Sequence, residues 1–109
     1  MVYFMDNYSI ERWGKRRDAI RAIITCRNED DTVRGCLRFW SEETRLSKAH
    51  VVDFSGVKVI YINYPISELE TIVDMLRNEK PIGLYYGSDD FASVYCGREP
   101  IGEEEHRDA

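Results

Sequence analysis

The basic residues with the clearest chemical potential lie in one short stretch, ERWGKRRDAIR, residues 11–21. Basic side chains beside an aromatic ring are what a phosphate backbone and a base contact in nucleic-acid complexes. The candidate set is Arg12, Trp13, Lys15, Arg16, Arg17 and Arg21. The segment also suits a charged turn between two strands, because Gly14 and Asp18 are typical turn residues. We favour the turn and keep anion binding as the alternative.

A second basic group is predicted from strand alternation. Two apolar runs, Ala19–Arg27 and Thr32–Trp40, are joined by the polar turn NEDD, which indicates a hairpin. Since alternate residues of a strand face opposite ways, we expect one face to carry four arginines, Arg21, Arg27, Arg34 and Arg38. Like charges on neighbouring strands repel, so carboxylates of the acidic second half, a second subunit or a bound polyanion should oppose them. Protein carboxylates are the explanation we prefer.

The acidic residues and histidines give weaker patterns. Asp89 and Asp90 would suit magnesium if a third carboxylate joined them, but GSDD is a common hairpin turn. His50 precedes Asp53 by three residues, and such residues of a strand face opposite ways, which argues against a catalytic base and its orienting acid. The sequence has no nucleophile motif and no glycine-rich phosphate loop. We therefore predict no catalytic residue, no metal and no cofactor, and lean against an enzyme.

The composition is that of a soluble globular domain. Of the 109 residues 43% are hydrophobic and 32% charged, and the net charge is -5. Residues 1–48 carry ten Lys or Arg and eight Asp or Glu, whereas residues 49–109 carry five and twelve. A net acidic chain binds nucleic acid poorly unless a basic face is set apart. Without an apolar run that could span a bilayer or a signal-peptide pattern, we expect a cytoplasmic protein that does not contact membranes.

The cysteines are expected to be structural. Cys26, Cys36 and Cys96 are an odd number without CxxC spacing, which argues against a disulfide scaffold and a zinc site. Strand alternation places Cys26 and Cys36 on opposite faces of the hairpin, so they should not form a disulfide. We predict small, buried apolar side chains.

The elements that position these residues are mostly strands. One helix is predicted over about residues 67–78, with a capping box of Ser67 and Glu70, an apolar stripe on one face and a stop before Pro81. Two further hairpins are predicted, one through Ser55-Gly56 and one over Ile82–Tyr86 and Phe91–Cys96. The expected fold is α+β, a mostly antiparallel, curved sheet of five to seven strands with the helix packed on one face. Residues 1–101 would form the domain and 102–109 a polar, acidic tail.

Three segments resemble a group of short, uncharacterised bacterial proteins: YSIERWGKRRD, YPISELETIVDMLRNEKP and GREPIGEEE. That group has no assigned activity, so the resemblance implies a small, self-standing bacterial domain and transfers no site residues.

Two features point to a protein partner. The run VKVIYINY is apolar on both alternating faces, so one face requires the helix and the other requires sheet curvature or a second subunit. Tyr85 and Tyr86 are strand neighbours, so one of them must point outward, and tyrosine is favoured in interfaces. We expect a non-enzymatic interaction module that self-associates as a homodimer. The alternative is a weak nucleic-acid or anion binder that uses the basic turn and the four arginines.

Overall fold

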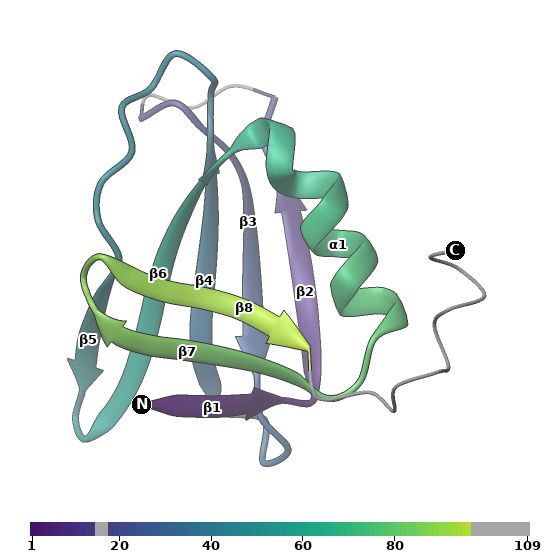
Figure 1. The fold of residues 1–109 in the computed structure, drawn as a ribbon, viewed down its shortest axis with the longest axis vertical. Coiled ribbons are helices and arrows are strands. Elements are labelled where there is room, and N and C mark those ends of the chain that lie inside the picture. The colour runs from purple at the N-terminus through teal and green to yellow at the C-terminus, as the bar shows by residue number, and fades with distance from the viewer. Residues whose placement is uncertain (15–17, 97–109) are drawn as a thin grey trace.

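The computed structural model describes residues 1–14 and 18–96, and these form eight strands, a 3-10 turn and one helix (Figure 1). In chain order the elements are β1 Val2–Met5, β2 Asn7–Arg12, β3 Ile20–Arg27, β4 Val33–Trp40, β5 His50–Phe54, β6 Val57–Pro65, the 3-10 turn Ile66–Glu68, α1 Leu69–Asn78, β7 Ile82–Ser88 and β8 Phe91–Cys96. The three predicted hairpins are confirmed as β3–β4, β5–β6 and β7–β8. The predicted tail, residues 102–109, and the end of the predicted domain lie outside the described residues.

The strands form two sheets rather than the single sheet of five to seven strands that we expected. A five-stranded sheet has the order β2-β3-β4-β6-β5, and a three-stranded sheet has the order β1-β7-β8. Every neighbouring pair is antiparallel except β4 and β6, which run parallel. The difference arises because β1, a segment without a predicted element, pairs with β7 and not with β2, which follows it after a single residue. The coarser prediction, mostly strand with one helix, is confirmed.

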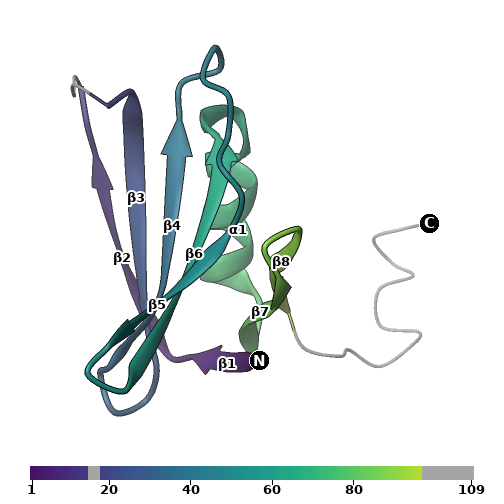
Figure 2. The same cartoon turned by 90° about the vertical axis from the view of Figure 1, so that its left-hand side faces the viewer.

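The hydrophobic core lies between the two sheets. Figure 2 shows α1 and the three-stranded sheet on the same side of the five-stranded sheet, whose other side we call the outer face. The largest fully buried side chains come from both sheets: Ile24, Cys26, Leu37, Phe39, Ile60 and Leu84. Helix α1 adds Leu69 and Ile72 to this core, which confirms its predicted apolar stripe.

The start of the helix differs from the predicted capping box. Residues 66–68 form a 3-10 turn, and α1 begins at Leu69 without a side-chain cap hydrogen bond. The backbone N–H of Ser67 instead donates to Oε2 of Glu42 at 2.9 Å. A carboxylate from the loop after β4 thus occupies the position that local capping was expected to fill. The predicted end is confirmed, since α1 stops at Asn78.

Candidate interaction surfaces

Two β-bulges divide the predicted arginine surface. The β3–β4 pairing is regular from Ala22 opposite Phe39 to Cys26 opposite Gly35, but the register shifts beyond each of these pairs. The shifts leave Arg21 and Arg34 without a partner residue on the opposite strand. The prediction of one surface with four arginines assumes strict alternation along the whole hairpin, and it does not hold in this form.

Arg34 points to the core side of the sheet. Its guanidinium carbon lies 4.6 Å from the centre of the Tyr3 ring, and Tyr3 packs against the core from β1. The Nε atom of Arg34 and the Nη1 atom of Arg21 are buried, and neither has a hydrogen-bond partner in the described part of the chain. A bulge can redirect a side chain in this way. Arg34 therefore leaves the predicted arginine surface, whereas Arg21 alternates with the buried Ile20 and Ala22 and stays on the side of Arg27.

Three of the four predicted arginines, Arg21, Arg27 and Arg38, remain on the outer face. Arg27 donates from Nη1 to Oγ of Ser9 at 3.4 Å, and its Nε lies 3.9 Å from Oδ1 of Asp31. Arg38 instead contacts two aromatic rings. Its guanidinium carbon lies 5.0 Å from the Tyr61 ring centre and 5.7 Å from that of Trp40. No carboxylate forms an ion pair with Arg38 within residues 1–14 and 18–96. The charge of Arg38 is thus balanced by aromatic rings rather than by the carboxylates that we expected.

Asn63 and His50 complete this arrangement. The Oδ1 atom of Asn63 accepts hydrogen bonds from Nε of Arg38 at 3.1 Å and from Nε1 of Trp40 at 2.9 Å. The His50 ring stacks on Tyr61, with centres 5.0 Å apart and planes inclined by 2°. Since β6 lies between β4 and β5, Arg38 and His50 approach the Tyr61 ring from opposite sides. Both faces of that ring are therefore occupied, which leaves none for a nucleic-acid base to stack on.

The basic stretch 11–21 lies where the chain reverses between β2 and β3. Arg12 ends β2, and Trp13 donates its backbone N–H to the carbonyl of Arg21 at 2.8 Å. This bond joins the two antiparallel strands, as the turn interpretation predicts. The other candidates of this stretch, Lys15, Arg16 and Arg17, lie outside the described residues.

Asp89 and Asp90 make the contacts of a turn. Asp89 accepts a hydrogen bond from the hydroxyl of Tyr86, and its carbonyl accepts one from the N–H of Ala49 at 3.2 Å. Asp90 lies 3.2 Å from Nζ of Lys48. Both residues thus fasten the β7–β8 turn to the loop that precedes β5. Among the residues that the structure describes, no three His, Cys, Asp or Glu side chains are grouped as metal ligands would be.

The cysteines occupy the predicted opposite faces. Cys26 is fully buried in the core, and burial raises the pKa of its thiol to about 12. Cys36 lies on the outer face, half-buried, and burial also raises the pKa of that thiol. All three cysteines are free thiols.

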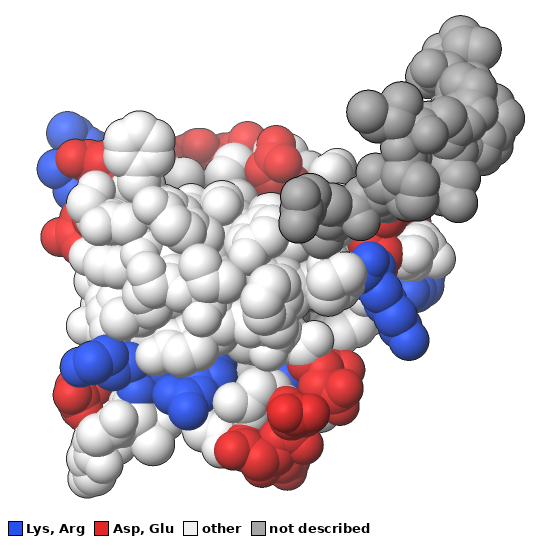
Figure 3. Space-filling view, turned by 60° about the horizontal axis from the view of Figure 1, so that its bottom comes forward, with Lys and Arg blue, Asp and Glu red and all other residues white. Residues whose placement is uncertain are grey.

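The three-stranded sheet carries a large uncharged surface that we did not predict. Strands β1, β7 and β8 contain no Asp, Glu, Lys or Arg, although 32% of the chain is charged. Their outward positions hold Val2, Phe4, Tyr85, Phe91 and Tyr95, which we call the aromatic face. Phe91 is 71% exposed and Phe4 56%. Figure 3 shows this side as a broad area without charge, bordered by charged residues at its rim.

Glycines let the tyrosines of the aromatic face lie flat on the sheet. A Cβ atom at Gly83 would lie 2.6 Å from Cζ of Tyr95, so the Tyr95 ring covers the backbone of the neighbouring strand. Tyr85 lies over Gly87 in the same manner. The Phe4 ring meets Tyr95 edge to face at 6.4 Å between centres. These two tyrosine rings therefore lie along the sheet. The expectation that either Tyr85 or Tyr86 points outward is confirmed, with Tyr85 exposed.

A signal for the aromatic face is present in the sequence but lies across distant segments. The charge-free run VYFM is separated by most of the chain from the runs IGLYYGS and FASVYC, which are neighbours in a hairpin, and the pairing of β1 with β7 brings the three together. In the described part of the chain no helix is long and apolar enough to cross a membrane. No family model, curated protein or solved structure matches this chain.

Proposed function

We propose that this protein is a non-enzymatic interaction module that forms a homodimer through the aromatic face. The observation that carries the proposal is the exposure of several large apolar side chains on one uncharged side of the molecule (Figure 3). Contiguous apolar surface of this kind is uncommon on soluble monomers and typically marks a docking site. Phenylalanine and tyrosine are also enriched in the buried centres of interfaces.

The lack of charge favours a second copy as the partner. In a two-fold dimer the same patch meets itself, so any charge near the axis would meet a like charge. The aromatic face satisfies this condition, because β1, β7 and β8 contain no charged residue.

The experiment measures the mass of the protein in solution. We expect sedimentation equilibrium to give a concentration-dependent dimer, and Phe4→Ser combined with Phe91→Ser to weaken it about 100-fold or more, because two central aromatic residues are lost from each copy. The control is Phe54→Ser, which removes a phenylalanine of similar exposure, 52%, from the β5–β6 hairpin. A protein that stays monomeric at several hundred micromolar, or a double variant that dimerises like the wild type, would refute the proposal.

Nucleic-acid or anion binding remains the alternative. Its support in the structure is the partly exposed side chain of Arg38, whose guanidinium contacts the rings of Trp40 and Tyr61 and no carboxylate of the described residues. Because the Tyr61 ring is occupied on both faces, contact would involve phosphate more than bases. Salt-sensitive binding of a labelled single-stranded oligonucleotide, abolished by Arg38→Gln and unaffected by Phe4→Ser, would favour this alternative over dimerisation alone.

A further inference from the structure

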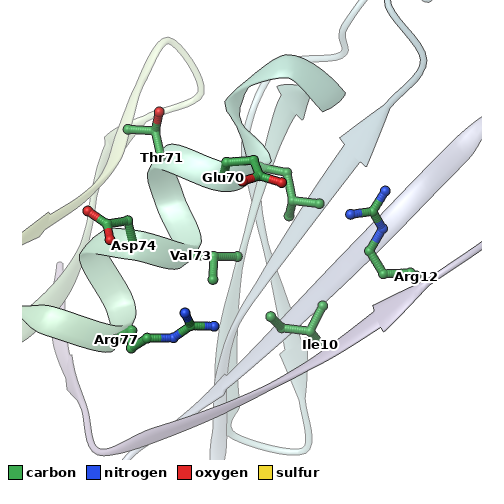
Figure 4. A pocket seen from close by; sticks show the side chains of 8 residues that line it. Ile10, Arg12, Glu70, Thr71, Val73, Asp74 and Arg77 are labelled. Carbon is green, nitrogen blue, oxygen red and sulfur yellow. The ribbon is translucent and has the colours of Figure 1, made fainter.

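A groove runs between α1 and β2, the edge strand of the five-stranded sheet. Two cavities of about 620 and 400 Å³ lie along it, and Arg77 lines both. The floor of the larger cavity is apolar, formed by Ile10 of β2 and by Leu69 and Val73 of α1 (Figure 4). Cavities of this size are typical of ligand sites.

The outer edge of β2 presents backbone N–H and C=O groups with which another strand could pair. The N–H of Trp13 bonds the carbonyl of Arg21, so odd-numbered residues of β2 form the hydrogen-bonded pairs with β3. The N–H and C=O groups of Ile10 and Arg12 therefore point away from β3. In the described part of the chain no strand pairs with that edge. Their side chains lie on the same side of the sheet as α1, which places them in the groove.

One guanidinium near the middle of the groove, that of Arg77, is suited to bind a carboxylate. Arg12 and Arg77 form no ion pair with any described residue. Figure 4 shows the Arg77 guanidinium directed towards Ile10 and Val73, whereas Asp74 points away from β2. Asp74 is also engaged, since it accepts a hydrogen bond from Nδ2 of Asn78 at 2.7 Å. The two cavities are lined by four carboxylates and three cations, so the groove as a whole carries no excess positive charge; these residues are Asp6, Glu70, Asp74, Glu79, Arg12, Arg77 and Lys80. A carboxylate is therefore expected only at the guanidinium of Arg77, which lines both cavities without an ion pair in the described part of the chain.

We propose that the groove binds an extended peptide of a partner protein, which adds a strand to the free edge of β2. The peptide backbone would pair with Ile10 and Arg12, one apolar side chain would lie over Ile10 and Val73, and an acidic side chain would pair with Arg77. Strand addition supplies affinity through the backbone and specificity through alternate side chains. This site is separate from the aromatic face, so it concerns a second partner and does not depend on dimerisation.

The test begins with random peptides displayed on phage and selected on the full chain. Enriched peptides should alternate apolar residues and carry an Asp or Glu. A labelled enriched peptide should bind Arg77→Gln at least about ten-fold more weakly than the wild type in fluorescence anisotropy, since a charge-assisted hydrogen bond is lost. The matched control is Arg45→Gln, which removes an exposed arginine from the loop between β4 and β5 and should leave the affinity unchanged.

Amide hydrogen exchange locates the bound peptide. Saturation should slow exchange of the Ile10 and Arg12 amides about ten-fold or more, because these donors gain carbonyl partners. Absence of enrichment, equal affinity for Arg77→Gln, or unprotected β2 amides would each overturn the proposal. A peptide whose binding is lost in the Phe4→Ser variant instead would place the site on the aromatic face and would also refute the groove.

Discussion

Replacement of Gly35 by alanine tests how the two sheets are held together. Gly35 lies in β4 opposite Cys26, and the side chain of Leu84 from β7 rests directly on it. A Cβ atom at this position would overlap Cδ1 of Leu84 and lie 3.4 Å from its Cγ. Leu84 is fully buried, so its side chain has little room to move away. We expect Gly35→Ala to push the three-stranded sheet from the five-stranded sheet.

The change in the free energy of unfolding is the difference between the cost of overfilling the core and the gain from a less flexible unfolded chain. Overfilling a packed core costs about 1–3 kcal/mol. Replacing glycine by alanine reduces the freedom of the unfolded chain, which returns about 0.4–1 kcal/mol. Gly35→Ala should therefore lower the free energy of unfolding by about 1–2 kcal/mol. At Gly14 a Cβ atom would meet nothing within 4 Å, so Gly14→Ala should show only the gain of about 0.4–1 kcal/mol and serves as the control.

Urea denaturation of a double-mutant cycle provides the measurement. Leu84→Ala alone should cost about 2–5 kcal/mol, because it leaves a cavity. In that background the added methyl group has space, so Gly35→Ala should cost nothing or be slightly stabilising, which gives a coupling of about 1–3 kcal/mol. If Gly35→Ala costs the same with and without the Leu84 side chain, the clash is not the cause and the packing argument fails.

Two further predictions concern the β3, β4 and β6 strands. Because burial raises the pKa of Cys26 from 9.0 to about 12, the folded state keeps its proton while the unfolded state loses it, so stability should fall as pH rises above about 9. At pH 10.5 this loss should reach about 2 kcal/mol and should be absent in Cys26→Ala, measured by urea denaturation from pH 8 to 10.5; a parallel decline in both proteins would contradict it. Asn63→Ala should lower the stability by about 1–3 kcal/mol, since Arg38 and Trp40 lose their common acceptor. Asn78→Ala at the exposed end of α1 should cost less than about 0.5 kcal/mol, and equal effects of the two substitutions would count against the Asn63 network.

The elements of this protein were more predictable than their assembly. Alternating apolar residues and turn residues are local signals, and they locate the β3–β4, β5–β6 and β7–β8 hairpins correctly. The parallel pairing of β4 with β6 and the separate sheet formed with β1 are long-range pairings. These pairings depend on which apolar faces pack against each other, and the spacing of residues along the chain does not predict that packing directly.

The candidate arginines show how a local rule fails at a particular residue. Alternation predicts that Arg34 and Arg38 share a face, and one extra residue in the β3–β4 ladder sends Arg34 to Tyr3 instead. A bulge needs no distinctive residue type, so the alternation rule assigned arginines an even number of residues apart on each strand to one surface. Two partners of Arg38, Asn63 and Tyr61, were equally hidden, because they come from β6, which pairs with β4 in parallel. Trp40 lies two residues from Arg38 on β4, so alternation does place it on the same face.

The three-stranded sheet is apolar on both sides, and only one side is explained by the fold. Its inner side must be apolar, because Ile82, Leu84 and Val94 fill the core. The outer positions carry no such requirement. Charged residues in place of Phe4 or Phe91 would leave the core unchanged, and Phe91, at 71% exposure, contributes little to folding. Exposed apolar strands also carry a risk of aggregation, which charged residues on the outer side would reduce. An apolar outer side that folding does not require is therefore the physical basis for the proposal that a second copy covers this face.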